Sequence, residues 1–97
     1  MKEQKKEERK ITPLITLERR GTVVICSELD LEFQIRPDEA PINLIGKAVS
    51  NAVVLIGSKD QGDARHMHKV LLATEVLSAW RNGSRLDEIA HVINIRR

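Results

Sequence analysis

The side chains of this chain best suited to binding chemistry are basic, and they flank the segment 64–82 at both of its ends. Arginine and lysine side chains contact nucleic-acid phosphates largely without regard to base sequence. The predicted nucleic-acid-binding residues are Lys59, Arg65, Lys69, Arg81, Arg85, Arg96 and Arg97. The partner predicted from this set is DNA or RNA.

The segment Gly57–Gly62 has the glycine spacing of a phosphate-binding loop. That motif continues with Lys and then Ser or Thr, where this chain has Asp63 and Ala64. A carboxylate at the start of the following helix repels the anion that the helix dipole attracts. A polar turn is therefore predicted here, and no cofactor.

Three histidines and one cysteine are the candidate metal ligands. His66 and His68 point about 200° apart if they lie on a helix, and His91 is distant in the chain. Zinc requires four converging ligands, or three and a water molecule, so no metal site is predicted. Cys26 lies in an apolar run and is predicted to be an inert core residue.

The carboxylates give no sign of general acid or base catalysis. Asp30 and Glu32 fall on the polar face of a predicted strand, without an apolar pocket that would raise a pKa. The chain also lacks the Gly-x-Ser-x-Gly motif of a nucleophile elbow. We therefore expect a protein that is not an enzyme.

Composition is that of one globular domain. Of the 97 residues, 41% are hydrophobic and 31% are charged, which argues against a disordered chain. Phe33 and Trp80 are the only aromatic residues, so stacking of bases on exposed rings is not expected. The net charge of +2 is too balanced to indicate nucleic acid by itself.

Localisation is predicted from the cysteine count and from the hydrophobic runs. A single cysteine favours a reducing compartment. No apolar run approaches the roughly 20 residues that span a bilayer, and the charged N-terminal segment lacks a signal-peptide pattern. These features predict a cytoplasmic protein without a membrane partner.

The chain divides into a charged, flexible tail at 1–10 and a single α+β domain at 11–97. Residues 14–17 and 23–26 are predicted strands, with a turn around Gly21. In residues 29–35, apolar and polar side chains alternate with a period of two, which predicts a half-buried strand that Pro37 ends.

The middle of the chain predicts a strand between two helices. The first helix begins at Pro41 and runs through about Ser50. The unbroken apolar run Val53–Ile56 is typical of a central strand that is covered on both faces. A long helix then spans 64–82, with Asp63 as N-cap and Gly83 beyond its end. Its predicted buried face holds Val70, Leu72, Ala73, Val76, Leu77, Ala79 and Trp80, opposite His68, Glu75, Ser78 and Asn82.

Residues 84–97 fit either a helix or a final edge strand. Glu75-Val-Leu, Gly83, Glu88-Ile-Ala and Ile93-Asn-Ile95 resemble the opening of the helix-turn-helix of LuxR/GerE-type regulators, over about a fifth of the chain. The resemblance implies a second helix after Gly83, without the recognition helix that would enter the major groove. Two packed helices joined by residues 82–84 account for the same residues.

The predicted fold is a small mixed β-sheet of about four strands, packed against one long helix and one or two short ones. The predicted function is that of a small non-catalytic binding or regulatory protein, with nucleic acid favoured as its partner. The alternative is a protein-interaction or assembly subunit, which pairs as a homodimer or with another protein.

Overall fold

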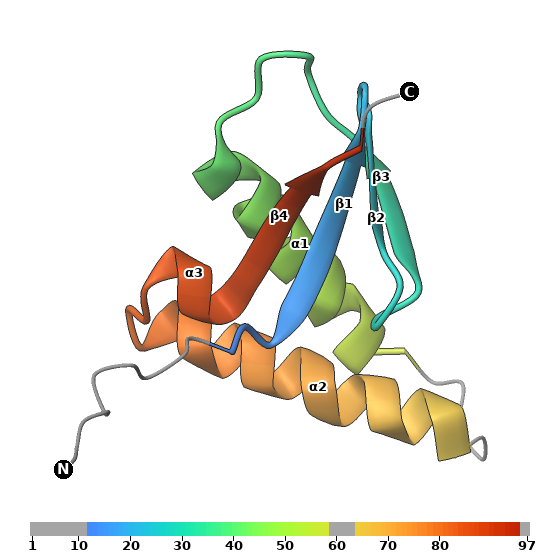
Figure 1. Ribbon diagram of the computed structural model, residues 1–97. Helices are drawn as coiled ribbons and strands as arrows, with labels where there is room; N and C mark the ends of the chain where they lie inside the picture. The colour runs from blue at the N-terminus through green and yellow to red at the C-terminus, as the bar shows by residue number, and fades with distance from the viewer. Residues whose placement is uncertain (1–11, 59–63, 96–97) are drawn as a thin grey trace, which may run out of the picture.

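In the computed structural model, a four-stranded mixed sheet is combined with three helices, in an α+β fold (Figure 1). The structure describes residues 12–58 and 64–95. The strands are β1 (Ile15–Arg20), β2 (Val23–Cys26), β3 (Leu31–Gln34) and β4 (Ala90–Asn94). The helices are α1 (Pro41–Ile56), α2 (Ala64–Arg81) and α3 (Leu86–Ile89). The predicted fold class is confirmed, although one of the predicted strands is not part of the sheet.

The sheet has the order β3-β2-β1-β4. The first three strands form an antiparallel meander, and β4 returns to pair in parallel with β1, with Leu17 opposite Val92. Gly21 has a φ of +61° in the two-residue turn between β1 and β2, where the sequence predicted a turn that needs positive φ. The predicted alternation near β3 is also confirmed, since Glu32 and Gln34 are exposed while Phe33 is half-buried.

The prediction that Val53–Ile56 is a central strand is wrong, because these residues form the last turn of α1. The apolar positions Leu44, Ala48 and Ala52 continue one buried helical stripe past Ser50. Asn51 lies inside the helix, and its Nδ2 donates to the Lys47 carbonyl oxygen one turn earlier, 2.8 Å away. A short apolar run has no periodicity that distinguishes a strand from a helix. Here the buried stripe that begins at Leu44 makes Val53–Ile56 part of the helix.

The core lies between one face of the sheet and the two long helices. Ile15, Leu17, Val24 and Cys26 face inward from β1 and β2, and all four are almost completely buried. Figure 1 shows α1 behind the sheet and α2 running beneath it. The long helix α2, which we expected to cover the sheet, instead packs chiefly against α1.

Gly83 ends α2 as predicted, with a φ of +75°. The Gly83 N–H donates to the Trp80 carbonyl oxygen (3.2 Å), and the Ser84 N–H donates to that of Ala79 (3.0 Å). These two bonds are those of a Schellman motif, which requires a residue with positive φ. The predicted N-cap, Asp63, lies outside the described residues.

Both readings of the C-terminal segment are partly correct. One helical turn, α3, is followed directly by the edge strand β4. The Glu88 carboxylate accepts a hydrogen bond from the Arg85 N–H (3.2 Å) at the start of α3, as in a capping box. The second helix implied by the helix-turn-helix resemblance is thus a single turn, Leu86–Ile89, because β4 begins at Ala90.

Candidate functional site

The structure places the described members of the predicted nucleic-acid-binding set at two separate ends of α2. Arg65 and Lys69 lie on its first two turns, and Arg81 and Arg85 lie at and just beyond its last turn. Arg81 lies sixteen positions after Arg65 along the helix, or about 24 Å at 1.5 Å per residue. Lys59, Arg96 and Arg97 lie outside the described residues. The basic side chains therefore do not form one surface within the part of the chain that the structure describes.

Two of these basic side chains are paired with carboxylates. Lys69 Nζ lies 3.3 Å from Asp30 Oδ2, and Arg85 Nη2 lies 2.8 Å from Asp87 Oδ2. Asp30 lies in the turn between β2 and β3 and has a φ of +56°. Its ion pair with Lys69 therefore links this turn to α2. Each pair reduces the positive potential available to a phosphate.

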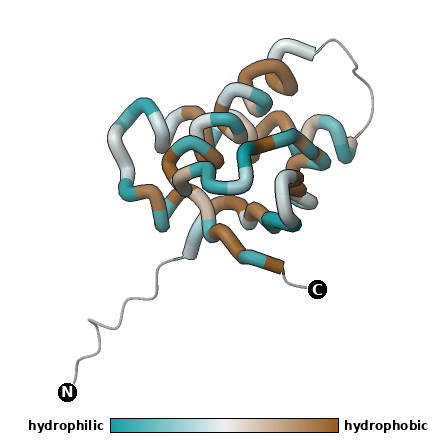
Figure 2. Tube along the Cα trace, turned by 90° about the horizontal axis from the view of Figure 1, so that it is seen from above, coloured by the Kyte–Doolittle hydropathy of each residue, from teal (hydrophilic) through white to brown (hydrophobic). Residues whose placement is uncertain are grey.

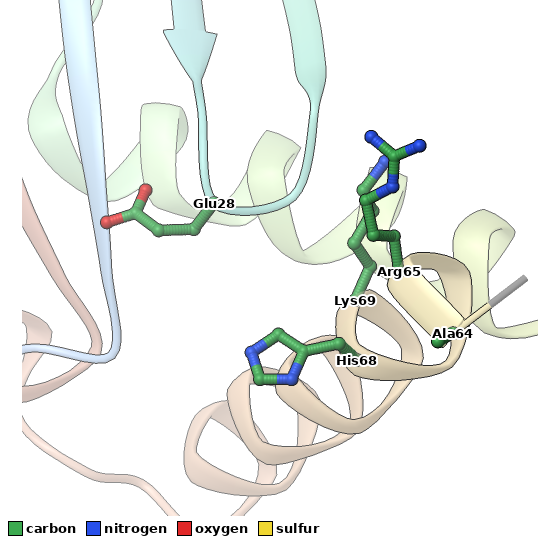
Figure 3. A pocket seen from close by; sticks show the side chains of 5 residues that line it. All are labelled: Glu28, Ala64, Arg65, His68 and Lys69. Atoms are coloured by element: carbon green, nitrogen blue, oxygen red, sulfur yellow. The ribbon is translucent and has the colours of Figure 1, made fainter.

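An open pocket of about 370 Å³ lies between the β2–β3 turn and the start of α2 (Figure 3). It is lined by Glu28, Ala64, Arg65, His68 and Lys69. In Figure 3, Arg65 and Lys69 point toward the hairpin turn, and the Glu28 carboxylate points toward β1. Both Glu28 oxygens accept the Thr16 N–H, at 3.1 and 3.2 Å. The pocket is therefore lined by side chains of both charges, and Glu28 opposes an anion there.

The Cys26 thiol donates a hydrogen bond to Glu28 Oε1, 3.6 Å away. Burial, aided by the nearby Glu28 charge, raises the pKa of the Cys26 thiol to about 11. The thiolate is the nucleophilic form of cysteine, and this thiol remains protonated at neutral pH. Cys26 is buried in the core, as predicted.

Glu39 has a structural role just before α1. Its carboxylate accepts the Arg36 N–H (3.1 Å) and the Asn43 side-chain amide (3.0 Å). The hydrogen bond from the Arg36 N–H is the main reason that the pKa of Glu39 is lowered. The Arg19 guanidinium donates to the carbonyl oxygens of Pro37 and Glu39, so this loop is tied to β1.

The histidines lie in three different environments. His66 is half-buried on α2, while His68 on α2 and His91 on β4 are exposed. In residues 12–58 and 64–95, no three His, Cys, Asp or Glu side chains gather closely enough to hold a metal ion.

Several large apolar side chains are exposed on the helices, which the sequence did not lead us to expect. Among the described residues, the large apolar side chains that are exposed are Ile42, Val53 and Val54 on α1, and Met67 and Leu71 on α2. We call these five residues the helical apolar surface. Figure 2 shows the hydrophobic last turn of α1 at the periphery of the molecule.

Sequence reasoning did not find this surface. It assigned Val53 and Val54 to a buried strand, and it assigned Met67 and Leu71 to neither face of the long helix. The sequence does contain a pattern that predicts exposure of Met67 and Leu71 on α2. Positions 64, 67, 71, 74 and 78 form a second, uncharged stripe on the side of the helix opposite its buried face.

Comparisons of the chain with protein-family models, with curated proteins and with solved structures found no match. Across residues 12–58 and 64–95, the structure contains no helix with the length and apolarity needed to cross a membrane.

Proposed function

We propose that this chain is a non-catalytic protein-binding or assembly subunit, and that its partner docks on the helical apolar surface. The observation that carries the proposal is the confinement of the exposed large apolar side chains, among the described residues, to α1 and α2. Single exposed apolar residues are common on protein surfaces; here they lie on two helices that pack against each other.

The composition of α1 supports the same proposal. Lys47 is the only charged residue among its 16 residues. A helix that is apolar on most sides is usually buried on most sides, yet Val54 is 72% exposed. Docking of a partner would remove this surface from water. Met67 adds an unbranched, adaptable side chain of the kind that protein-binding surfaces use.

Site-resolved photo-crosslinking in cells tests this proposal. A photoreactive amino acid is placed at Val54, Met67 or Leu71, and at Gln34 on β3 as the control, because Gln34 is exposed and lies on the sheet. We expect protein adducts at the three helical positions in clear excess over the control. Equal yields at all four positions would refute docking on α1 and α2.

Contact with nucleic acid is a second candidate function, favoured by the pocket that brings together Arg65, His68 and Lys69. These side chains stand on the first turns of α2, where the helix dipole favours anions. Binding to single- and double-stranded DNA and RNA should then weaken steeply with salt. Lys69→Ala should reduce the salt dependence more than Arg81→Ala. An absence of binding at low salt would remove this candidate.

A further inference from the structure

The exposed side of α2 carries an uncharged stripe that includes two large apolar residues, Met67 and Leu71. Ala64, Met67, Leu71, Thr74 and Ser78 follow one another at intervals of three and four residues. At 100° per residue they fall inside an arc of about 80°. None is charged, and at its centre Leu71 is 63% exposed while Met67 is 58% exposed. Spacing of this kind is that of a helix that pairs with another helix.

We propose that the occupant of this stripe is a second copy of this chain, with the two α2 helices antiparallel across a two-fold axis near Leu71. This inference rests on the proposed function, because it names the partner of the helical apolar surface. A two-fold interface brings the same surface of both copies together, so Leu71 meets the partner's Leu71, and Met67 faces the partner's Thr74.

The charges beside the stripe favour the antiparallel arrangement. His68 and Glu75 are exposed on the same flank of the stripe, three residues before and four residues after Leu71. When the second helix is reversed about Leu71, His68 and the partner's Glu75 lie within about 1.5 Å of each other along the helix axis.

The same pairing occurs again on the other side of the axis, so the interface contains two His–Glu pairs. An imidazole N–H donates a hydrogen bond to a carboxylate, whether the ring is neutral or charged. In a parallel two-fold arrangement, the flank that carries His68 and Glu75 would lie on opposite sides of the contact in the two copies, so these pairs would not form.

The small number of large apolar side chains in the stripe limits the affinity that we expect for the dimer. Each copy contributes two large apolar side chains of the stripe, Met67 and Leu71. An interface of standard size buries about 800 Å² per partner and usually contains more large apolar side chains than this. We therefore expect a dissociation constant of roughly 1–100 μM rather than a permanent dimer.

Analytical ultracentrifugation of the full chain from about 1 μM to 1 mM tests this pairing. The wild type is expected to change from monomer to dimer across this range. Leu71→Glu should weaken the dimer by about a hundredfold or more, because the substitution is present twice at the centre of the contact. Gln34→Glu adds the same charge on β3 and should leave the equilibrium unchanged. Far-UV circular dichroism checks that both variants remain folded.

A charge exchange tests the orientation. Glu75→Lys should weaken the dimer by roughly three- to tenfold, since it removes two exposed pairs. The double variant His68→Glu/Glu75→Lys restores opposite charges at both pairs and should recover most of the affinity. A double variant that is no tighter than Glu75→Lys would overturn the antiparallel arrangement.

The outcomes separate this inference from the proposed function. A wild type that stays monomeric at the highest concentration overturns self-pairing. In that case, crosslinks from Met67 and Leu71 to other proteins would still support the proposed function. A dimer that is insensitive to Leu71→Glu overturns the pairing through α2. Loss of site-specific crosslinks as well would overturn the proposed function.

Discussion

Replacing Gly46 with alanine should stabilise the protein, and the size of the effect follows from the packing of α1 against α2. Glycine inside a helix costs about 1 kcal/mol relative to alanine. A Cβ at position 46 would lie 3.6 Å from Cη2 and 3.9 Å from Cζ2 of Trp80, which is ordinary van der Waals contact. The added methyl therefore fits without displacing the indole ring. We expect Gly46→Ala to raise the free energy of unfolding by about 1 kcal/mol, or Tm by roughly 4–8 °C.

The matched control is Gly83→Ala, which should have the opposite sign. Nothing lies within 4 Å of a Cβ built at Gly83, but its φ is +75°. Its cost is therefore one of backbone conformation alone, about 1–2 kcal/mol.

Both variants and the wild type are unfolded by heat and by urea at one fixed protein concentration, because association shifts Tm. Ellipticity and Trp80 fluorescence follow the transitions. A destabilised Gly46→Ala variant would refute the deduced spacing between α1 and the Trp80 ring.

Two further predictions concern titratable groups. Cys26 has a pKa of about 11, so at pH 8 iodoacetamide should modify the folded protein at least about a hundredfold more slowly than the urea-unfolded chain. Because this pKa is raised, its contribution to stability is present below about pH 8.5 and is lost as the pH rises toward the folded-state pKa. Comparable alkylation rates would show that the thiol is accessible. The pKa of Glu39 is lowered by the hydrogen bond from the Arg36 N–H. The contribution of Glu39 to the stability of the fold is therefore present above about pH 4.3 and is lost as the pH falls through the folded-state pKa. Urea unfolding between about pH 5 and pH 2.5 should therefore be less dependent on pH in Glu39→Gln than in the wild type, and parallel curves would contradict this assignment.

The sequence predicted those parts of the fold in which local chemistry and tertiary packing agree. Residues around β3 alternate because one face of that strand is wet, Pro41 begins α1 at a position that needs no N–H, and Gly83 ends α2 by taking a positive φ. The buried face of α2 was also predicted, since Ala73 and Val76 lie at its centre and are fully buried.

The remaining errors come from segments whose local pattern fits two structures. Val53–Ile56 is apolar enough for a buried strand, but the stripe begun at Leu44 carries it into α1. The described part of the C-terminal segment, residues 84–95, could be assigned only after pairing with β1 made β4 a strand. The helical apolar surface depends on which sides of α1 and α2 remain uncovered, and that is a property of packing rather than of any local motif.

Disulfide trapping at position 71 tests the central claim, that α2 presents a self-complementary surface, most directly. Helix axes pack about 8–10 Å apart and Cα atoms lie about 2.3 Å from their axis, so two facing Cα atoms come within reach of a disulfide. Cys26 can remain in place because it is buried. Under mild oxidation, Leu71→Cys is predicted to give a covalent dimer of twice 11.0 kDa, whereas Gln34→Cys stays largely monomeric. Equal amounts of dimer from both variants, or none from Leu71→Cys at millimolar concentration, would contradict the claim.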